Sequence, residues 1–210
     1  QYRSINIVFC VDPPHSVDMA RVREFDTDKA LEAAMRLFWR KGYVATSMAD
    51  IYEATGLKAG SLYAAFKDKE TLFQQTFERY AARFRETLPK DKTGRAAIEA
   101  WLRLQAKLAI EDADRAGCLI INTVTEREAH SQATQALAQG RMREIRDFFA
   151  RNLVLAVEAG ELPRGADVDA CADALLGAVV SIMTLGRAGA DERTIRNVAE
   201  AALLGLPRLN

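Results

Sequence analysis

Hydrophobic residues recur along most of the chain at the spacing of one face of an α-helix. Leu31, Ala34, Met35 and Phe38 stand at positions i, i+3, i+4 and i+7, so that they form a single apolar stripe. The strict alternation of apolar and polar residues that marks a half-buried strand is almost absent from the chain. The pattern therefore predicts an all-α fold.

Prolines and helix caps divide this pattern into separate helices. Because proline breaks helix interiors, the proline-free blocks 15–88, 90–162 and 164–206 limit where helices can lie. Capping residues and glycine stops then predict helices over 28–42 (with Asp28 as N-cap), 46–55, 59–66, 68–88, 94–110, 118–129, 132–159, 167–187 and 191–204.

Two of the predicted helices, 46–55 and 59–66, are short and are joined by a glycine turn. Gly56 can adopt the left-handed backbone conformation that such a turn requires, and Leu57 is expected to fill the corner beneath both helices. This arrangement is typical of a helix-turn-helix, whose second helix enters the major groove of DNA. From the spacing alone, an ordinary helical bundle is equally well supported.

Three stretches in and around these helices carry a more specific pattern. They are Thr46-Ser47-Met48-Ala49-Asp50-Ile51, Gly56-Leu57-Lys58-Ala59-Gly60-Ser61-Leu62-Tyr63 and Phe66-Lys67-Asp68-Lys69-Glu70-Thr71-Leu72-Phe73. The pattern closely resembles the DNA-binding domain of the TetR (tetracycline-repressor-like) family over residues 24–84. The chain departs from that family at Lys58, where a Ser or Thr cap is usual, and at Tyr52 and Thr55, where small residues are usual.

The resemblance implies DNA-binding roles for the second short helix and its flanks. The residues implied to face the major groove are Ala59, Gly60, Ser61 and Ala64, of which Ser61 would hydrogen-bond to a base. Those implied to hold phosphates are Thr46, Lys58, Tyr63 and Lys69, with Arg21 and Arg23 as an arm ahead of the first helix. The alternatives are solvated surface charges for the Lys and Arg residues and, for Tyr63, a half-buried ring that braces the first helix.

Charge and composition add little about partners. The chain has 29 basic and 29 acidic side chains, so its net charge is zero and does not by itself favour nucleic acid. Three cysteines and two histidines are scattered without the spacing of a metal site or a disulfide framework. We therefore expect no metal, no cofactor and a cytoplasmic location, and the lack of a nucleophile–base motif argues against an enzyme.

The chain is expected to have three parts. Residues 1–18 differ from the rest of the chain, because they contain a β-prone run that ends at two prolines. Met19 is interpreted as the biological start, and the preceding segment as cloning-derived or misassigned coding sequence. The alternative is a genuine extension that packs on the fold. Residues 19–88 would form the helix-turn-helix domain, and residues 89–210 a helical ligand-binding and dimerisation domain.

The helix 167–187 is apolar on nearly every side, and we interpret it as a buried helix. Its longest apolar stretch, 174–183, is about half of the ~20 residues that a membrane-spanning helix needs, so no membrane partner is expected. With the helix 191–204 it would suit a symmetric four-helix interface between two copies of the chain, as the resemblance also implies. The alternative is a helix central to a monomer's own core.

A ligand cavity is expected among residues 94–187. The predicted lining residues are Trp101, Leu104, Leu108, Ile121, Phe148 and Phe149, with Asn122 as a polar group that orients the ligand, although such residues are more often plain core. Cys118 follows Gly117 at a predicted helix start, in a segment similar to one in TetR regulators that respond to reactive electrophiles. It is predicted either to sense electrophiles with a depressed pKa or to be a buried core residue.

Together these expectations describe a homodimeric transcriptional repressor that a small molecule releases from a palindromic operator of double-stranded DNA. The alternative is a helical interaction or ligand-binding protein whose DNA motif is vestigial. The motif residues Gly56, Gly60, Tyr63 and Lys69 argue against that alternative, because all four are intact.

Overall fold

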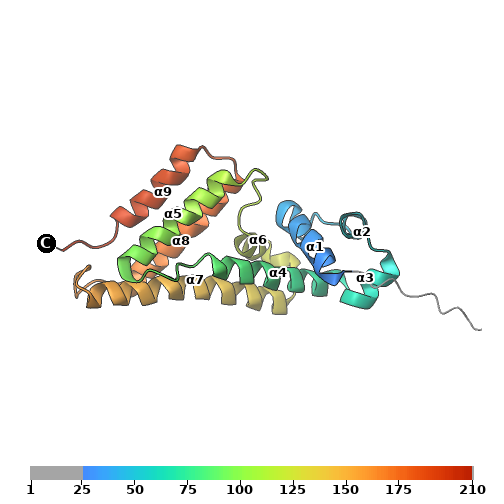
Figure 1. Ribbon diagram of the computed structural model, residues 1–210, viewed down its shortest axis with the longest axis horizontal. Helices are drawn as coiled ribbons and strands as arrows, with labels where there is room; N and C mark the ends of the chain where they lie inside the picture. The colour runs from blue at the N-terminus through green and yellow to red at the C-terminus, as the bar shows by residue number, and fades with distance from the viewer. Residues whose placement is uncertain (1–25, 210) are drawn as a thin grey trace, which may run out of the picture.

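Helices make up the part of the chain that the computed structural model describes, residues 26–209, and no strand occurs within it (Figure 1). The helices are α1 (Thr27–Lys41), α2 (Met48–Thr55), α3 (Ala59–Phe66), α4 (Lys69–Glu86), α5 (Gly94–Glu111), α6 (Leu119–Thr125), α7 (Gln132–Glu158), α8 (Val168–Arg187) and α9 (Glu192–Leu204), with a 3-10 turn at Arg127–Ala129. The predicted all-α fold is confirmed. The predicted extension 1–18 and the predicted arm residues Arg21 and Arg23 lie outside the described residues.

Short polar side chains set where most of these helices begin. Ser47, Asp68, Asp167 and Asp191 each accept a hydrogen bond from a backbone N–H in the first turn, as their positions predict. The predicted cap of α1 is wrong: Asp26 caps this helix, with Oδ1 at 3.1 Å from the Lys29 amide nitrogen.

The predicted helix 118–129 is also too long. The α-helix α6 ends at Thr125, and a separate 3-10 turn follows it. At this point Glu126 leaves the helical conformation, and its carboxylate accepts a hydrogen bond of 2.9 Å from the Tyr43 backbone N–H. This hydrogen bond to Tyr43, in the turn between α1 and α2, takes the place of another helical turn at the end of α6.

The helices form two groups that α4 connects. In Figure 1, α1, α2 and α3 gather at one end, α5, α8 and α9 at the other, and α4 and α7 run along the length between them. α4 packs against α1 and α3 on one side and against α6 on the other, while α7 packs against α5, α6 and α8. Because α4 belongs to both groups by contact, the predicted boundary between residues 88 and 89 stays a prediction.

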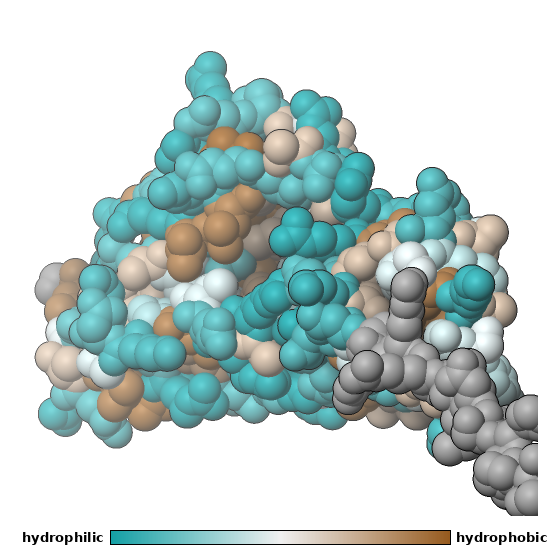
Figure 2. Space-filling view, turned by 45° about the vertical axis from the view of Figure 1, so that its right-hand side comes forward, coloured by the Kyte–Doolittle hydropathy of each residue, from teal (hydrophilic) through white to brown (hydrophobic). Residues whose placement is uncertain are grey.

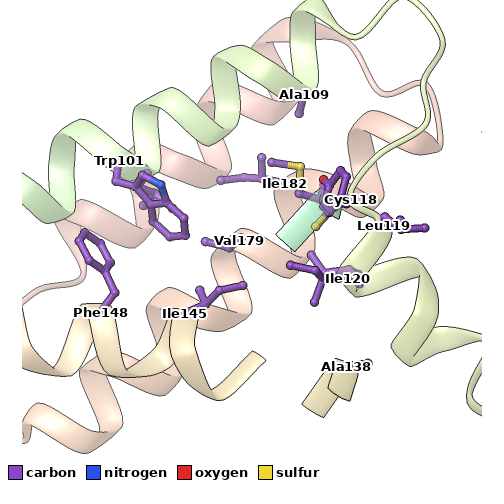
Figure 3. Packing of buried hydrophobic residues seen from close by; sticks show 14 of the residues in the cluster. Trp101, Ala109, Cys118, Leu119, Ile120, Ala138, Ile145, Phe148, Val179 and Ile182 are labelled. Carbon is purple, nitrogen blue, oxygen red and sulfur yellow. The ribbon is translucent and has the colours of Figure 1, made fainter. Parts of the chain in front are cut away.

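Aromatic rings fill the core of the second group. The ring centroids of Trp101 and Phe148 are 5.0 Å apart, and those of Trp101 and Phe149 are 5.4 Å apart. Figure 3 shows Trp101 and Phe148 turned toward the same interior as Ile145, Val179 and Ile182. The indole Nε1 of Trp101 donates to the Thr87 hydroxyl at 3.0 Å, so the one polar atom of this ring is also satisfied.

Within the single chain helix α8 is buried along one face, and the prediction that its other face is buried between two copies of the chain stays a prediction. Its inner side, including Leu175, Val179 and Ile182, packs into the core. Small residues occupy the opposite side and are exposed in the single chain, at Ala174, Gly177, Ser181 and Thr184. Within residues 26–209, α8 is one helix whose length and composition would let it cross a membrane. Its exposed side instead has the small residues that allow two helices to approach closely.

Candidate functional site

The helix-turn-helix begins with a tightly fixed N-terminus of α2. The Ser47 backbone N–H donates to Asp50 Oδ2 at 2.6 Å, and the Asp50 N–H donates to the Ser47 hydroxyl at 3.1 Å, which completes the predicted capping box. Lys41 Nζ donates to the same Asp50 oxygen at 2.6 Å. The Lys41 ammonium, and the Ser47 hydroxyl after it, hold the pKa of Asp50 well below its usual range.

The turn between α2 and α3 depends on Gly56. This residue has φ +67° and ψ 11°, the left-handed conformation that side chains disfavour, and its N–H donates to the Tyr52 carbonyl at 2.9 Å. α3 starts three residues later at Ala59, after Lys58, whose side chain makes no capping hydrogen bond. The helix therefore begins without the side-chain cap that a Ser or Thr would supply at position 58.

Helix α3 divides cleanly into a buried side and an exposed side. Leu62 and Phe66 are buried against the rest of the helix-turn-helix. The predicted groove-facing residues are all exposed, and they are Ala59, Gly60, Ser61 and Ala64. A Cβ added at Gly60 would meet nothing within 4 Å, so the surface above it is open.

Of the four residues predicted to hold phosphates, two are exposed and two are wholly or partly buried. Tyr63 is 72% exposed, so the alternative of a half-buried brace is wrong. Thr46 is buried, and its hydroxyl donates to the Gly42 carbonyl at 2.6 Å. Lys69 Nζ donates to the Tyr43 carbonyl at 2.6 Å and lies 4.1 Å from the centre of the Tyr43 ring, where burial lowers its pKa. Lys58 is exposed, and the phosphate roles of all four stay predictions.

Polar contacts join the helix-turn-helix group to the second group of helices, and sequence spacing did not indicate them. Trp39 Nε1 donates to the Gly117 carbonyl at 2.7 Å, and Arg187 of α8 donates to the Trp39 carbonyl at 3.3 Å. At the start of α7, the Ser131 and Thr134 hydroxyls donate hydrogen bonds to the carboxylate of Glu70 in α4. These pairs are far apart in sequence, so no local pattern could reveal them.

His130 is a buried part of the same junction. Its ring lies 4.6 Å from the ring of Tyr43 and 4.8 Å from that of Phe73, measured between centroids. Neither ring nitrogen has a hydrogen-bond partner within the described residues. Burial lowers the pKa of this imidazole, and the nearby carboxylates of Glu70 and Glu126 only partly oppose the shift.

A cavity of about 340 Å³ lies at the junction of the two groups. A hollow with apolar surface is visible near the middle of the molecule in Figure 2. The cavity is lined from α1, α4, α5, α8 and the loop after α5, by Met35, Trp39, Tyr80, Arg83, Phe84, Thr87, Gln105, Leu108, Ala109, Glu111, Asp112, Gly117 and Met183. It has the size and mostly apolar character of a small-molecule site.

Among the described residues, one cation lines this cavity, and it is already paired. Arg83 donates to both carboxylate oxygens of Glu32, at 2.9 Å and 2.6 Å. This contact, followed by that of Arg36, lowers the pKa of Glu32 to about 2. Glu111 and Asp112 line the cavity as well, so its charged rim carries more acidic than free basic groups.

Most of the predicted ligand-binding residues lie elsewhere. Leu108 lines the cavity and is 41% exposed. The others pack in the core or at its edge, at Leu104, Trp101, Phe148 and Phe149, or line a second hollow of about 120 Å³, at Ile121 and Asn122. The cavity also draws on α1 and α4, outside the predicted range 94–187, because these helices pack across the end of α5.

Cys118 is buried beside the cavity and does not have the depressed pKa predicted for a sensor. Figure 3 shows its side chain among Leu119, Ile120 and Ile182. Burial raises the pKa of the thiol, and the hydrogen bonds from Ile121 N–H and the Tyr80 hydroxyl offset this only in part. The other predicted outcome, a small core residue, matches this environment. Among residues 26–209 no group of three or more His, Cys, Asp or Glu side chains could hold a metal ion.

Comparisons with known proteins identify the family. Residues 30–76 match the family model described as bacterial regulatory proteins of the tetR family, and residues 95–202 match the tetracyclin repressor-like C-terminal domain. The HTH-type transcriptional repressor ComR of Escherichia coli K12 is 32% identical over 90% of this chain and 92% of its own length. The uncharacterized HTH-type transcriptional regulator YezE of Bacillus subtilis is 27% identical over 88% of this chain and 98% of its own length.

Solved structures agree with this assignment. A cysteine mutant of the TetR family transcriptional regulator CifR, complexed with 26 bp of double-strand operator DNA, superposes with a TM-score of 0.78 and 27% identity over 89% of this chain and all of that chain. A TetR regulator of Chloroflexus aurantiacus has the same TM-score at 24% identity, over 87% and 96% of the two chains. Proteins of this kind are regulators and not enzymes. The chain belongs to the TetR family, and it is a DNA-binding transcriptional regulator.

Proposed function

We propose that this regulator is a homodimeric repressor that leaves its operator when a small molecule fills the cavity between α1, α4 and α5. The observation that carries this proposal is that Trp39 of the helix-turn-helix group and Gln105 of the second group line the same cavity. A molecule bound there contacts both groups at once. It therefore has a means of changing how the helix-turn-helix is held relative to the rest of the chain.

The exposed side of α3 is the proposed DNA-reading surface. Ala59, Gly60 and Ser61 lie at the N-terminal end of α3, where small side chains let the backbone approach base edges. Lys58 and Tyr63 flank this surface and are both exposed, so they can reach phosphates. Operator DNA in the CifR complex supports this part of the proposal.

Dimerisation is proposed to use the exposed side of α8 together with α9. One recognition helix contacts too few bases for useful selectivity, whereas two related by a two-fold axis read a palindrome. Gly177 and Ser181 leave a surface of small side chains exposed on α8, and Leu204 of α9 is a large exposed hydrophobic residue. Two copies of this pair of helices would bury that surface.

Release then follows from the geometry of two linked α3 helices. The spacing of the two helices must match successive major grooves, and a ligand that favours another spacing lowers the affinity for the operator. The same linkage requires that operator DNA lowers the affinity for the ligand. We place the protein in the cytoplasm, because its operator lies there, and we assign it no enzymatic activity.

The experiment that tests this proposal measures operator release in a variant with a filled cavity. Leu108→Trp adds bulk to a lining position that is already partly exposed, and Lys107→Trp is a matched control on an exposed neighbouring position outside the lining. Binding to the DNA upstream of the coding sequence is followed by fluorescence anisotropy. We expect compounds that raise the melting temperature of the wild type to release DNA from it and from Lys107→Trp, but not from Leu108→Trp.

Two results would contradict the proposal. Equal release from Leu108→Trp and the wild type would place the effector site elsewhere. No binding of the wild type to upstream DNA or to a random library of duplexes would support the alternative, an interaction protein with a vestigial DNA motif.

A further inference from the structure

The amide of Gln105 is a buried polar group that nothing in the described residues satisfies. Gln105 lies in α5 and is 0% exposed. Neither its Nε2 nor its Oε1 has a hydrogen-bond partner. Buried amides are almost always paired, because an unpaired one loses its hydrogen bonds to water on folding without replacing them. An unpaired buried amide therefore calls for an explanation in terms of function.

The position of Gln105 supplies that explanation. Its side chain forms part of the cavity lining, which also includes the rings of Tyr80 and Phe84 and the apolar side chains of Leu108 and Met183. No hydrogen bond holds the amide in its covered orientation, and the side chain has three rotatable bonds. The amide can therefore turn toward a ligand without breaking a hydrogen bond to another described residue.

The other polar groups of the lining are already engaged or are acidic. Thr87 Oγ accepts from Trp101 and donates to the Phe84 carbonyl. Arg83 is held by Glu32 through two hydrogen bonds, and Asp112 accepts from the Gly117 and Asp114 amides. Gln105 is thus the buried lining residue with both a donor and an acceptor to offer.

The charged groups of the cavity also indicate the charge of the ligand that it can bind. Glu111 and Asp112 belong to its lining, and Arg83 is the one basic residue that residues 26–209 contribute to it. Because Arg83 is already neutralised by Glu32, a carboxylate or phosphate would find no free cation and would meet two carboxylates. An anionic ligand is disfavoured on this ground, and an uncharged one is not.

We propose that Gln105 determines the specificity of this cavity, and that it selects an uncharged, flat and mostly apolar molecule with a cis-amide edge, such as a lactam, an imide or a primary carboxamide. On such an edge an N–H donor and a C=O acceptor stand side by side, as they do on the glutamine amide, and the two edges form a pair of hydrogen bonds. Aromatic rings from Trp39, Tyr80 and Phe84 supply flat apolar contact for the rest of the molecule. The inference rests on the proposed function only in taking this cavity as the effector site.

The test compares three probes of one shape by isothermal titration calorimetry. The first probe is 2-quinolinone, a bicyclic lactam with the complete edge. The second is N-methyl-2-quinolinone, which lacks the donor, and the third is 2-naphthoate, which is anionic. We expect the wild type to bind 2-quinolinone at least tenfold more tightly than either of the others, because the analogues leave the Gln105 amide unpaired or bring a negative charge to an acidic rim.

Two variants assign this preference to Gln105. Gln105→Leu keeps the approximate volume but removes the amide, and Gln139→Leu changes an exposed glutamine on α7 outside the cavity. In Gln105→Leu the preference for 2-quinolinone over its N-methyl derivative should fall from tenfold or more to about onefold, while Gln139→Leu keeps it. The melting temperature of ligand-free Gln105→Leu should also rise, because an unpaired buried amide has been removed.

The outcomes of this test distinguish a failure of the inference from a failure of the proposed function. If the probes bind without discrimination and Leu108→Trp abolishes binding, the cavity is a ligand site but Gln105 does not select amides. Tighter binding of 2-naphthoate, or a preference unchanged in Gln105→Leu, overturns it likewise, as does no binding of 2-quinolinone to the wild type. If 2-quinolinone binds through Gln105 and leaves the operator complex intact, the inference holds and the proposed release mechanism fails.

Discussion

The indole Nε1 of Trp39 donates a hydrogen bond of 2.7 Å to the carbonyl oxygen of Gly117. Trp39 belongs to α1 of the helix-turn-helix group, and Gly117 lies in the loop before α6. Gly117 has φ +69°, and a Cβ at this position would lie 3.2 Å from the Met183 carbonyl of α8. The bond therefore ties α1 to a loop that has no room to move toward α8. Trp39 and Gly117 both line the cavity as well, so a ligand bound there contacts this hydrogen-bonded pair directly.

Trp39→Phe should weaken the coupling between ligand and DNA. The phenyl ring keeps the apolar wall but cannot donate to Gly117, so a ligand no longer acts through this bond. Couplings of this kind change affinity by roughly 5- to 150-fold, and we expect the change to fall below about threefold in the variant. The measurement is operator affinity by anisotropy, with and without a saturating compound that raises the melting temperature of the wild type.

Trp101→Phe is the control for that variant, because its indole is buried in the core, does not line the cavity and makes no bond between α1 and the loop before α6. It should lose some stability and keep the coupling. Equal coupling in Trp39→Phe and the wild type would show that the signal takes another route.

His130 should make the protein less stable as pH falls from 7 to 5. Burial lowers the pKa of the folded imidazole below its unfolded value of about 6.5, so the unfolded chain binds the extra proton in this range. The stability from the neutral ring is therefore complete above about pH 6.5 and is lost as pH falls below it. The pKa of Glu70 is also lowered, so this carboxylate stays ionised throughout the range and does not produce the slope.

The measurement for His130 is the melting temperature at several pH values in the wild type and in His130→Phe. The phenyl ring keeps the stacking on Tyr43 and Phe73, and the variant should show a distinctly flatter dependence between pH 7 and 5. Parallel curves for the two proteins would mean that another group titrates.

Cys118 should be inert toward thiol reagents in the folded protein. The thiolate is the reactive form, and burial both raises the thiol pKa and excludes the reagent. Cys171 is only half-buried, so iodoacetamide should label it first in a Cys10→Ser background. Peptide mapping by mass spectrometry gives both rates, and labelling in urea shows that Cys118 is competent once exposed. Labelling of Cys118 as fast as Cys171 without denaturant would restore it as a sensor candidate.

Sequence patterns predicted the features that depend on neighbouring residues. The Ser47–Asp50 capping box, the left-handed Gly56 and the cap at Asp68 are local, and each lies where the pattern indicates. The cap of α1 was misplaced by two residues because both Asp26 and Asp28 satisfy the local rule. Asp28 is instead drawn to Arg79 on α4, at 2.9 Å, which only the folded chain reveals.

The cavity could not be predicted for the same reason. Its lining combines Trp39, Tyr80 and Gln105 from three helices, and each one resembles an ordinary core residue in its own helix. Burial of Cys118 also depends on packing and not on its place at a helix start. Trp39 stands at i+8 of the apolar stripe that begins at Leu31, so its position in the sequence gave no sign that it lines a cavity.

Lys58 and Lys69 should differ when each is replaced by alanine. Lys58→Ala removes an exposed cation beside α3, so operator affinity should fall for all sequences alike and the salt dependence should flatten by about one unit, with no change in melting temperature. Lys69→Ala also removes the bond to the Tyr43 carbonyl, so it should lower the melting temperature as well as the affinity. Anisotropy at several salt concentrations and thermal melts distinguish the two. An unchanged salt slope in Lys58→Ala would end its assignment as a phosphate contact.

Gly177→Glu should convert the protein to a monomer. In the single chain a Cβ at Gly177 meets nothing within 4 Å, and glutamate forms helix better than glycine, so the variant should fold normally. Between two copies of α8 the same side chain would bring a carboxylate and its symmetry mate into an apolar contact, which is strongly unfavourable. Sedimentation at micromolar concentration should give about twice 23.3 kDa for the wild type and 23.3 kDa for the variant.

Operator binding supplies the second readout for Gly177→Glu. A monomer presents only one α3 helix, so its affinity for a palindromic operator should fall to that for random DNA. Ala136→Glu, at an exposed position on α7, is the control and should leave both the dimer and operator binding intact. A dimeric Gly177→Glu protein would show that the chains associate through another surface. A monomeric variant with full operator affinity would show that α3 binds its site without a symmetric partner.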